Sequence, residues 1–100
     1  MQPSTMVERL ENQVEKEQRD VRILRAVIEH GPIGIVRLSE VTDLPEHKVR
    51  YSLRMLEEDE LVEPTPNGAI PADDVEERIE DINEGIDHLV GRLADLKQIL

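Results

Sequence analysis

Apolar residues in the first third of the chain recur at helical spacing. Thr5 and Glu8 form a capping pattern at the start of this stretch. From there to His30 the chain has no Gly or Pro. Apolar residues fall every three or four positions if Glu17 is counted as the one polar exception. This pattern predicts one long helix, or two abutting helices with a joint near residues 17–20. Gly31-Pro32 ends the stretch.

The next stretch has the pattern of two helices that meet at an angle. Ile35, Leu38 and Val41 mark one face of a short helix, and Asp43-Leu44-Pro45 breaks it because Pro disfavours helix in the preceding residue. A second helix is predicted over residues 46–58. Its apolar positions repeat at i, i+4 and i+7, which indicates one buried face. These positions are Val49, Leu53 and Leu56.

Two short strands are predicted after this helix. Residues 61–63 have a strand pattern, residues 64–68 contain the turn signal Pro66-Asn67-Gly68, and residues 69–70 form the returning strand. Ile33 can pair with them as a very short strand. The predicted fold is mainly α with a small β wing: a winged helix-turn-helix with an N-terminal helix and a C-terminal coiled-coil helix.

The tail has the most regular pattern in the chain. Asp73 is a good N-cap residue, with Glu76 three positions later. Apolar residues then recur in steps of four and three up to the last residue, which is the 3.5-residue repeat of a helix–helix seam. We therefore expect a homodimer through this helix. The dimerisation residues are Val75, Ile79, Ile82, Ile86, Leu89, Leu93, Leu96 and Leu100.

Residues beside this repeat favour an antiparallel pair of tails. A parallel pair would set Arg92 against Lys97 of the second copy, whereas an antiparallel pair can set Glu76 against Lys97. Val90 and Ile99 widen the apolar stripe, which leaves room for the N-terminal helix beside it. The predicted organisation is an N-terminal helix at 1–19, the winged domain at 20–70 and the dimerisation helix at 71–100.

Charge is distributed unevenly. The chain has 12 Lys and Arg against 23 Asp and Glu, for a net charge of −11. The bases of the second helix of the pair nevertheless gather on its outward side, together with the one aromatic residue of the chain. A local basic patch sets the contact potential because salt screens more distant charge. This outward set is His47, Lys48, Arg50, Tyr51 and Arg54.

Composition also excludes several classes of function. The chain has no Cys, which excludes disulfides and thiolate metal sites, and no apolar run or N-terminal signal directs it to a membrane or to secretion. The three His residues are scattered, and there is no phosphate loop or nucleophile motif. We expect a cytoplasmic protein that is not an enzyme, with no cofactor, no metal and no evident small-molecule ligand. The excess of Asp and Glu, with nine Arg to three Lys, is typical of salt-accumulating archaea.

The stretch LSEVTDLPEHKVRYSLRMLEEDELVEP resembles the winged helix-turn-helix of archaeal transcriptional regulators in the broad MarR/ArsR-like group. The resemblance covers about half of the chain, and Glu60 departs from it where the family pattern usually has Gly. It implies binding to double-stranded DNA, with helix 46–58 in the major groove and Asn67 at the tip of the wing. Arg37 and Lys48 suit phosphates, and Arg50 and Arg54 suit guanine edges.

Two other functions fit the same pattern. A winged helix can serve as a protein–protein interaction module, which suits a strongly acidic chain. A nucleoid-type protein would bind DNA without sequence preference. The sequence does not distinguish these from a regulator, and it does not reveal an operator or an effector.

Overall fold

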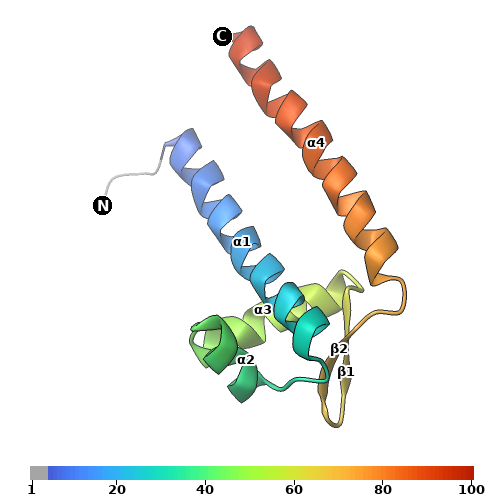
Figure 1. Cartoon of the computed structure of the whole chain (residues 1–100). Helices are drawn as coiled ribbons and strands as arrows, with labels where there is room; N and C mark the ends of the chain where they lie inside the picture. The colour runs from blue at the N-terminus through green and yellow to red at the C-terminus, as the bar shows by residue number, and fades with distance from the viewer. Residues whose placement is uncertain (1–4) are drawn as a thin grey trace.

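The computed structural model describes residues 5–100 as a small winged domain with two long helical arms (Figure 1). The element order is α1 (Met6–His30), α2 (Ile35–Thr42), α3 (Glu46–Glu58), β1 (Val62–Thr65), β2 (Gly68–Pro71) and α4 (Val75–Ile99). The structure is mainly helical, with one small antiparallel sheet. The predicted fold class is therefore confirmed. Among the described residues, no helix is both long enough and apolar enough to cross a membrane.

The first helix is a single unbroken helix, which decides between the two alternatives that its sequence left open. The Thr5 hydroxyl accepts a hydrogen bond from the backbone N–H of Glu8 at 3.1 Å, as the capping pattern predicts. The helix ends at His30, where the N–H of Gly31 donates to the carbonyl of Val27. Because α1 is continuous, the predicted boundary between residues 19 and 20 falls within a helix.

The core lies where α1, α2 and α3 meet the hairpin. Ile23, Val27, Leu38 and Val49 are fully buried there, and Leu53 and Leu56 of α3 are buried beside them. All these side chains are aliphatic, since the one aromatic residue of the chain lies at the surface. Burial of each such side chain contributes about 1.5–3 kcal/mol to folding.

The hairpin is slightly longer than the sequence indicates. β1 runs from Val62 to Thr65, so Leu61 lies outside it and the turn is reduced to Pro66 and Asn67, between the paired residues Thr65 and Gly68. The predicted short strand at Ile33 is confirmed as a bridge to Ala69.

Two helix ends differ from the sequence pattern. The N-cap of α4 is Asp74 rather than Asp73, and its side chain makes no capping hydrogen bond. Its carboxylate instead accepts a hydrogen bond from Arg78 at 3.0 Å. Glu60, after α3, has φ 59°. This left-handed conformation is one that Gly adopts at least cost, as the usual Gly at this position would.

Gly68 is the glycine that the fold requires most strictly. It has φ 121°, and a Cβ at this position would lie 2.5 Å from the carbonyl carbon of Ile33. We expect Gly68→Ala to lower the free energy of unfolding by about 2–4 kcal/mol, through backbone strain and overpacking. Urea denaturation measures this effect. Gly34→Ala is the control because a Cβ at Gly34 meets no atom within 4 Å. Equal losses for the two variants would contradict this account of the hairpin.

Candidate nucleic-acid interface

Helix α3 has one buried face and one exposed face. Val49, Leu53 and Leu56 point into the core, as their spacing predicts. At about 100° per residue, His47 and Arg54 fall on the opposite side of the helix. The structure leaves the whole predicted set on α3 exposed: His47, Lys48, Arg50, Tyr51 and Arg54.

The bases of α3 are available to a ligand. Among residues 5–100, the salt bridges involve none of Lys48, Arg50 and Arg54. Arg and Lys side chains without an acidic partner can bind phosphate oxygens or base edges without first breaking an ion pair. The exposed face of α3 therefore presents three such cations.

Arg37 and Asn67 lie on other elements. Arg37 is exposed on α2, and its Nη1 lies 3.4 Å from Oε2 of Glu40. A surface pair of this kind contributes little to stability, so a phosphate can compete for the guanidinium. Asn67 is exposed at the tip of the hairpin, and its backbone N–H donates to the hydroxyl of Thr65 at 3.2 Å.

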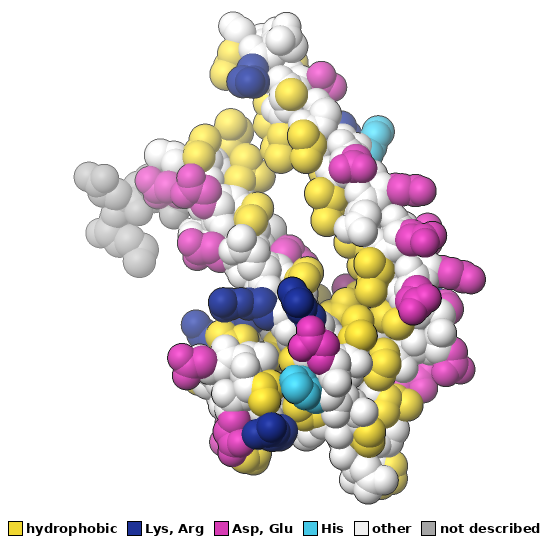
Figure 2. All heavy atoms as spheres, in the orientation of Figure 1, with side chains coloured by type: hydrophobic (Ala, Val, Ile, Leu, Met, Phe, Trp, Pro, Cys, Tyr) yellow, Lys and Arg dark blue, Asp and Glu magenta, His cyan; other side chains and the backbone are white. Residues whose placement is uncertain are grey.

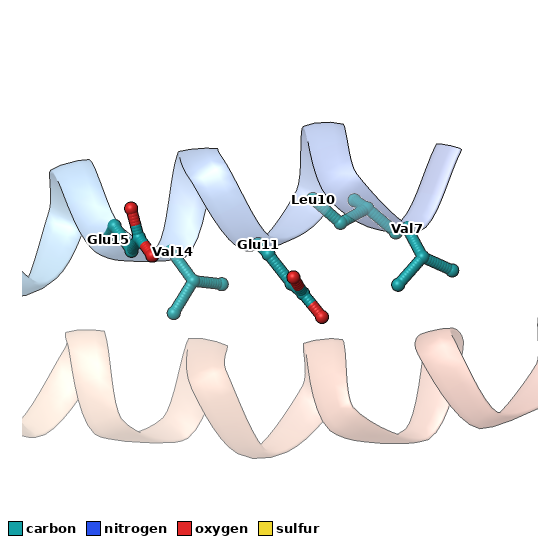
Figure 3. A pocket seen from close by; sticks show the side chains of 5 residues that line it. All are labelled: Val7, Leu10, Glu11, Val14 and Glu15. Carbon is teal, nitrogen blue, oxygen red and sulfur yellow. The ribbon is translucent and has the colours of Figure 1, made fainter. Parts of the chain in front are cut away.

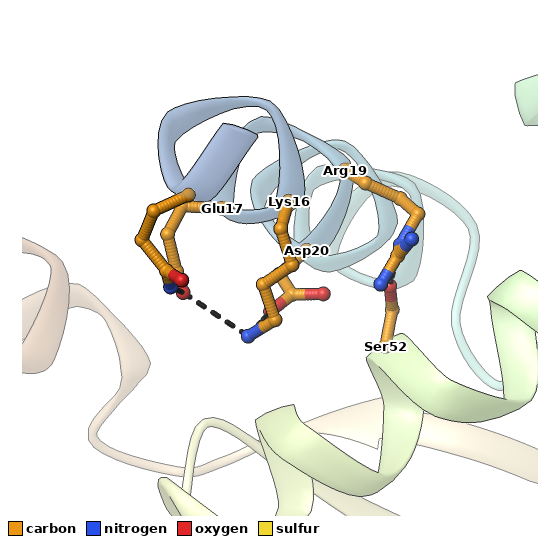
Figure 4. A network of polar contacts seen from close by, with 6 residues as sticks. Lys16, Glu17, Arg19, Asp20 and Ser52 are labelled. Atoms are coloured by element: carbon orange, nitrogen blue, oxygen red, sulfur yellow. Dashed lines mark hydrogen bonds and ion pairs between the residues drawn. The ribbon is translucent and has the colours of Figure 1, made fainter. Parts of the chain in front are cut away.

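The structure adds Arg19 of α1 to this surface. Its Nε donates a hydrogen bond to Oγ of Ser52 on α3 at 3.0 Å (Figure 4). Its guanidinium carbon also lies 5.5 Å from the centre of the Tyr51 ring, a cation–π distance. Tyr51 remains 50% exposed. Arg19 therefore fixes the aromatic side chain of the predicted face and adds a positive charge beside it.

Arg19 could not be identified from the sequence because its contacts depend on how α1 crosses α3. The one feature of the sequence that points to Arg19 is its position one turn before the core residue Ile23. This position places Arg19 at the edge of the buried face of α1. Ser52 gave no signal either, since a fully buried Ser on α3 is ordinary for a packed helix.

A second set of polar contacts lies within α1, on both sides of Arg19 in sequence. Lys16 Nζ lies 2.7 Å from Oδ2 of Asp20 and 3.0 Å from Oε1 of Glu17 (Figure 4). Asp20 is only 4% exposed, and its Oδ1 has no hydrogen-bond partner among the described residues. The hydrogen bond to Asp20 raises the pKa of Lys16, and the bond to Glu17 adds to this effect. Lys16 consequently stays protonated and compensates the buried carboxylate.

Acidic residues limit the basic surface. Figure 2 shows Lys and Arg side chains gathered where α1 meets the winged domain, whereas acids cover the outer side of α4. At the end of α3, acids occupy four consecutive exposed positions from Glu57 to Glu60. These charges repel phosphates, so the part of α3 that could accept a polyanion lies before Glu57. Within residues 5–100, no group of three His, Asp or Glu side chains is placed to hold a metal ion.

The comparison with known families agrees with this geometry. Residues 16–63 match the family described as winged helix-turn-helix DNA-binding. The match runs from the Lys16–Asp20 pair through α2 and α3 to the first wing strand. The domain is a winged helix-turn-helix, and the match supports DNA binding as its role. No protein of curated function matches the chain.

The contact of Arg19 with α3 yields a prediction. We expect Arg19→Ala to lower the free energy of unfolding by about 1 kcal/mol, because Ser52 loses its hydrogen-bond partner. DNA affinity should fall about five- to tenfold, since Tyr51 is released and a nearby cation is lost. Thermal unfolding and fluorescence anisotropy with a labelled duplex measure the two effects. Arg19→Lys should recover part of the affinity but not the stability, and wild-type affinity in Arg19→Ala would show that Arg19 lies outside the interface.

Proposed function

We propose that this protein is a transcriptional regulator that binds DNA as a homodimer, with α3 in the major groove. The observation that carries the proposal is the concentration of unpaired bases on the outward face of α3 in a chain of net charge −11. The match of residues 16–63 to a DNA-binding family supports it. In an acidic chain, the exposed bases of α3 provide a surface that a polyanion can approach.

The chemistry of each side chain suggests its role. Arg50 and Arg54 can each bind O6 and N7 of a guanine, and such a pair discriminates by about 1–3 kcal/mol. Lys48 and Arg37 suit phosphates, which fix the register of the protein on the duplex without reading sequence. Tyr51, held by Arg19, can pack on a sugar or a thymine methyl group.

The homodimer is proposed to form through α4. From Ile82 onward the apolar residues of its 3.5-residue repeat are exposed, whereas Val75 is buried in the core of the domain and Ile79 packs against that core. An isolated apolar helix face of this length is unfavourable in water. A two-fold dimer would place two α3 helices about one helical turn apart on a roughly palindromic site. The cytoplasm is the compartment that this function implies.

The experiment that tests the proposal is retention of genomic DNA fragments by the purified protein across a salt series up to molar KCl. A regulator retains a few fragments selectively. If the protein comes from a salt-accumulating cell, this selectivity persists at high salt, where a Debye length of about 3 Å leaves only short-range contacts. Retention of all fragments would indicate a nucleoid-type protein, and retention of none would indicate a protein-interaction module.

A further inference from the structure

Two apolar rows face each other across the space between α1 and α4. Figure 2 shows hydrophobic side chains on the facing sides of the two arms. On α4 the row runs from Ile82 to Leu96, and its members are 37–53% exposed. On α1 the row consists of Val7, Leu10 and Val14, which are 40–55% exposed. Figure 3 shows Val7 and Val14 of α1 directed toward the α4 backbone.

The two rows do not bury each other within one chain. The α1 row lines a hollow of about 320 Å³ together with Glu11 and Glu15. The radius of gyration of 15.8 Å exceeds the roughly 13 Å expected for a compact domain of this length, because the arms extend away from the winged domain. Within residues 5–100, no other element covers either row (Figure 1).

We propose that a second copy of this chain inserts its α4 into this space, so that α1 and α4 of both copies form a four-helix bundle. The proposal rests on the homodimer of the proposed function and goes beyond it. In this bundle the N-terminal half of α1 is part of the dimer interface. In the simpler dimer, only the two α4 helices contact each other.

The available apolar area suits a second copy. The two rows hold eight large aliphatic side chains: Val7, Leu10, Val14, Ile82, Ile86, Leu89, Leu93 and Leu96. At about half exposure each, they offer on the order of 700 Å² per protomer, close to the roughly 800 Å² per partner that a stable interface buries. A seam between two α4 helices alone would leave the α1 row in water.

Charge also favours α1 as a neighbour of α4. Glu11 and Glu15 line the same hollow as the α1 row, and Figure 3 shows Glu11 directed toward the α4 backbone. Arg92 and Lys97 border the α4 row, and neither enters an ion pair in the described part of the chain. The acids of α4 cover its outer side, away from α1 (Figure 2). An α4 helix therefore meets α1 with bases against acids, whereas two parallel α4 helices would bring bases together.

Val14→Asp tests the inference, with Asn12→Asp as the matched control. Both variants add one acid to the same part of α1, but residue 12 lies about 160° around the helix from residue 14 and faces solvent. Sedimentation equilibrium measures the dimer dissociation constant, and circular dichroism verifies folding. We expect Val14→Asp to raise the constant by about 100-fold or more and Asn12→Asp to change it little.

The other outcomes separate this inference from the proposed function. A Val14→Asp dimer of wild-type affinity would overturn the four-helix bundle and leave a dimer through α4 alone. A wild-type protein that is monomeric at all concentrations would overturn both the bundle and the homodimer. DNA retention, measured separately, reports on the α3 face in each case.

Discussion

Replacing both Arg50 and Arg54 with alanine is expected to weaken binding to a selected DNA fragment by about 1000-fold. Each bidentate contact with guanine supplies about 1–3 kcal/mol, and each 1.4 kcal/mol is a factor of ten in affinity. Both side chains are exposed, so the fold should not depend on them. Fluorescence anisotropy with the selected duplex and with an unrelated duplex measures the loss.

Charge-preserving variants separate base recognition from simple attraction. Arg50→Lys with Arg54→Lys keeps both cations but removes the planar fork that binds guanine bidentately. This variant should bind the selected and the unrelated duplex with nearly equal, weak affinity. Arg25→Ala removes an exposed base of α1 that pairs with Glu29, and this variant should bind like wild type. Unchanged binding in the double alanine variant would show that α3 is not the recognition helix.

Placing Asp at both Leu89 and Leu93 is expected to dissociate the homodimer. The two positions occupy successive turns of the exposed apolar row of α4, and a carboxylate buried in a helix seam lacks a partner. The dimer dissociation constant should rise by at least about 1000-fold, as measured by sedimentation equilibrium. As the dimer dissociates, affinity for a duplex with two half-sites should also fall, because the two domains no longer bind as a unit.

The control for this variant adds two acids to the outer side of the same helix. His88 and Gln98 lie off the apolar row, so the double variant His88→Asp, Gln98→Asp should leave the dimer intact. Circular dichroism should also show lost helix in the Leu89/Leu93 variant only. Gly85 and Gly91 each weaken an isolated helix by about 1 kcal/mol, so α4 depends on its partner. Equal dimer affinity in both variants would contradict a seam along α4.

Local patterns predicted most of the winged domain. The bounds of α3 and its buried apolar residues follow from i, i+4 spacing beside Pro45, and these signals involve neighbours in sequence. The cap of α4 was predicted one residue early because Asp73 and Asp74 are identical neighbours, and residue type alone does not show which of them begins the helix. That choice depends on side-chain geometry rather than on residue type.

Contacts between distant segments could not be predicted from the sequence. The stacking of Arg19 on Tyr51 joins residues 32 positions apart and requires the crossing of α1 over α3. The repeat of α4 likewise does not show that Val75 and Ile79 serve the core of their own domain while the row from Ile82 onward stays exposed. The regular apolar repeat of α4 thus forms two different surfaces in the folded chain, one in the domain core and one exposed.

Interference by guanine methylation on a selected DNA fragment would test whether α3 lies in the major groove. Methylation at N7 places a bulky group in the major groove, where α3 is proposed to lie, and blocks an Arg that would bind there. If two α3 helices bind as a dimer, we expect interference at guanines in two half-sites whose centres lie about 10 base pairs apart. Undiminished binding to DNA methylated at every guanine N7 would contradict recognition by α3 in the major groove.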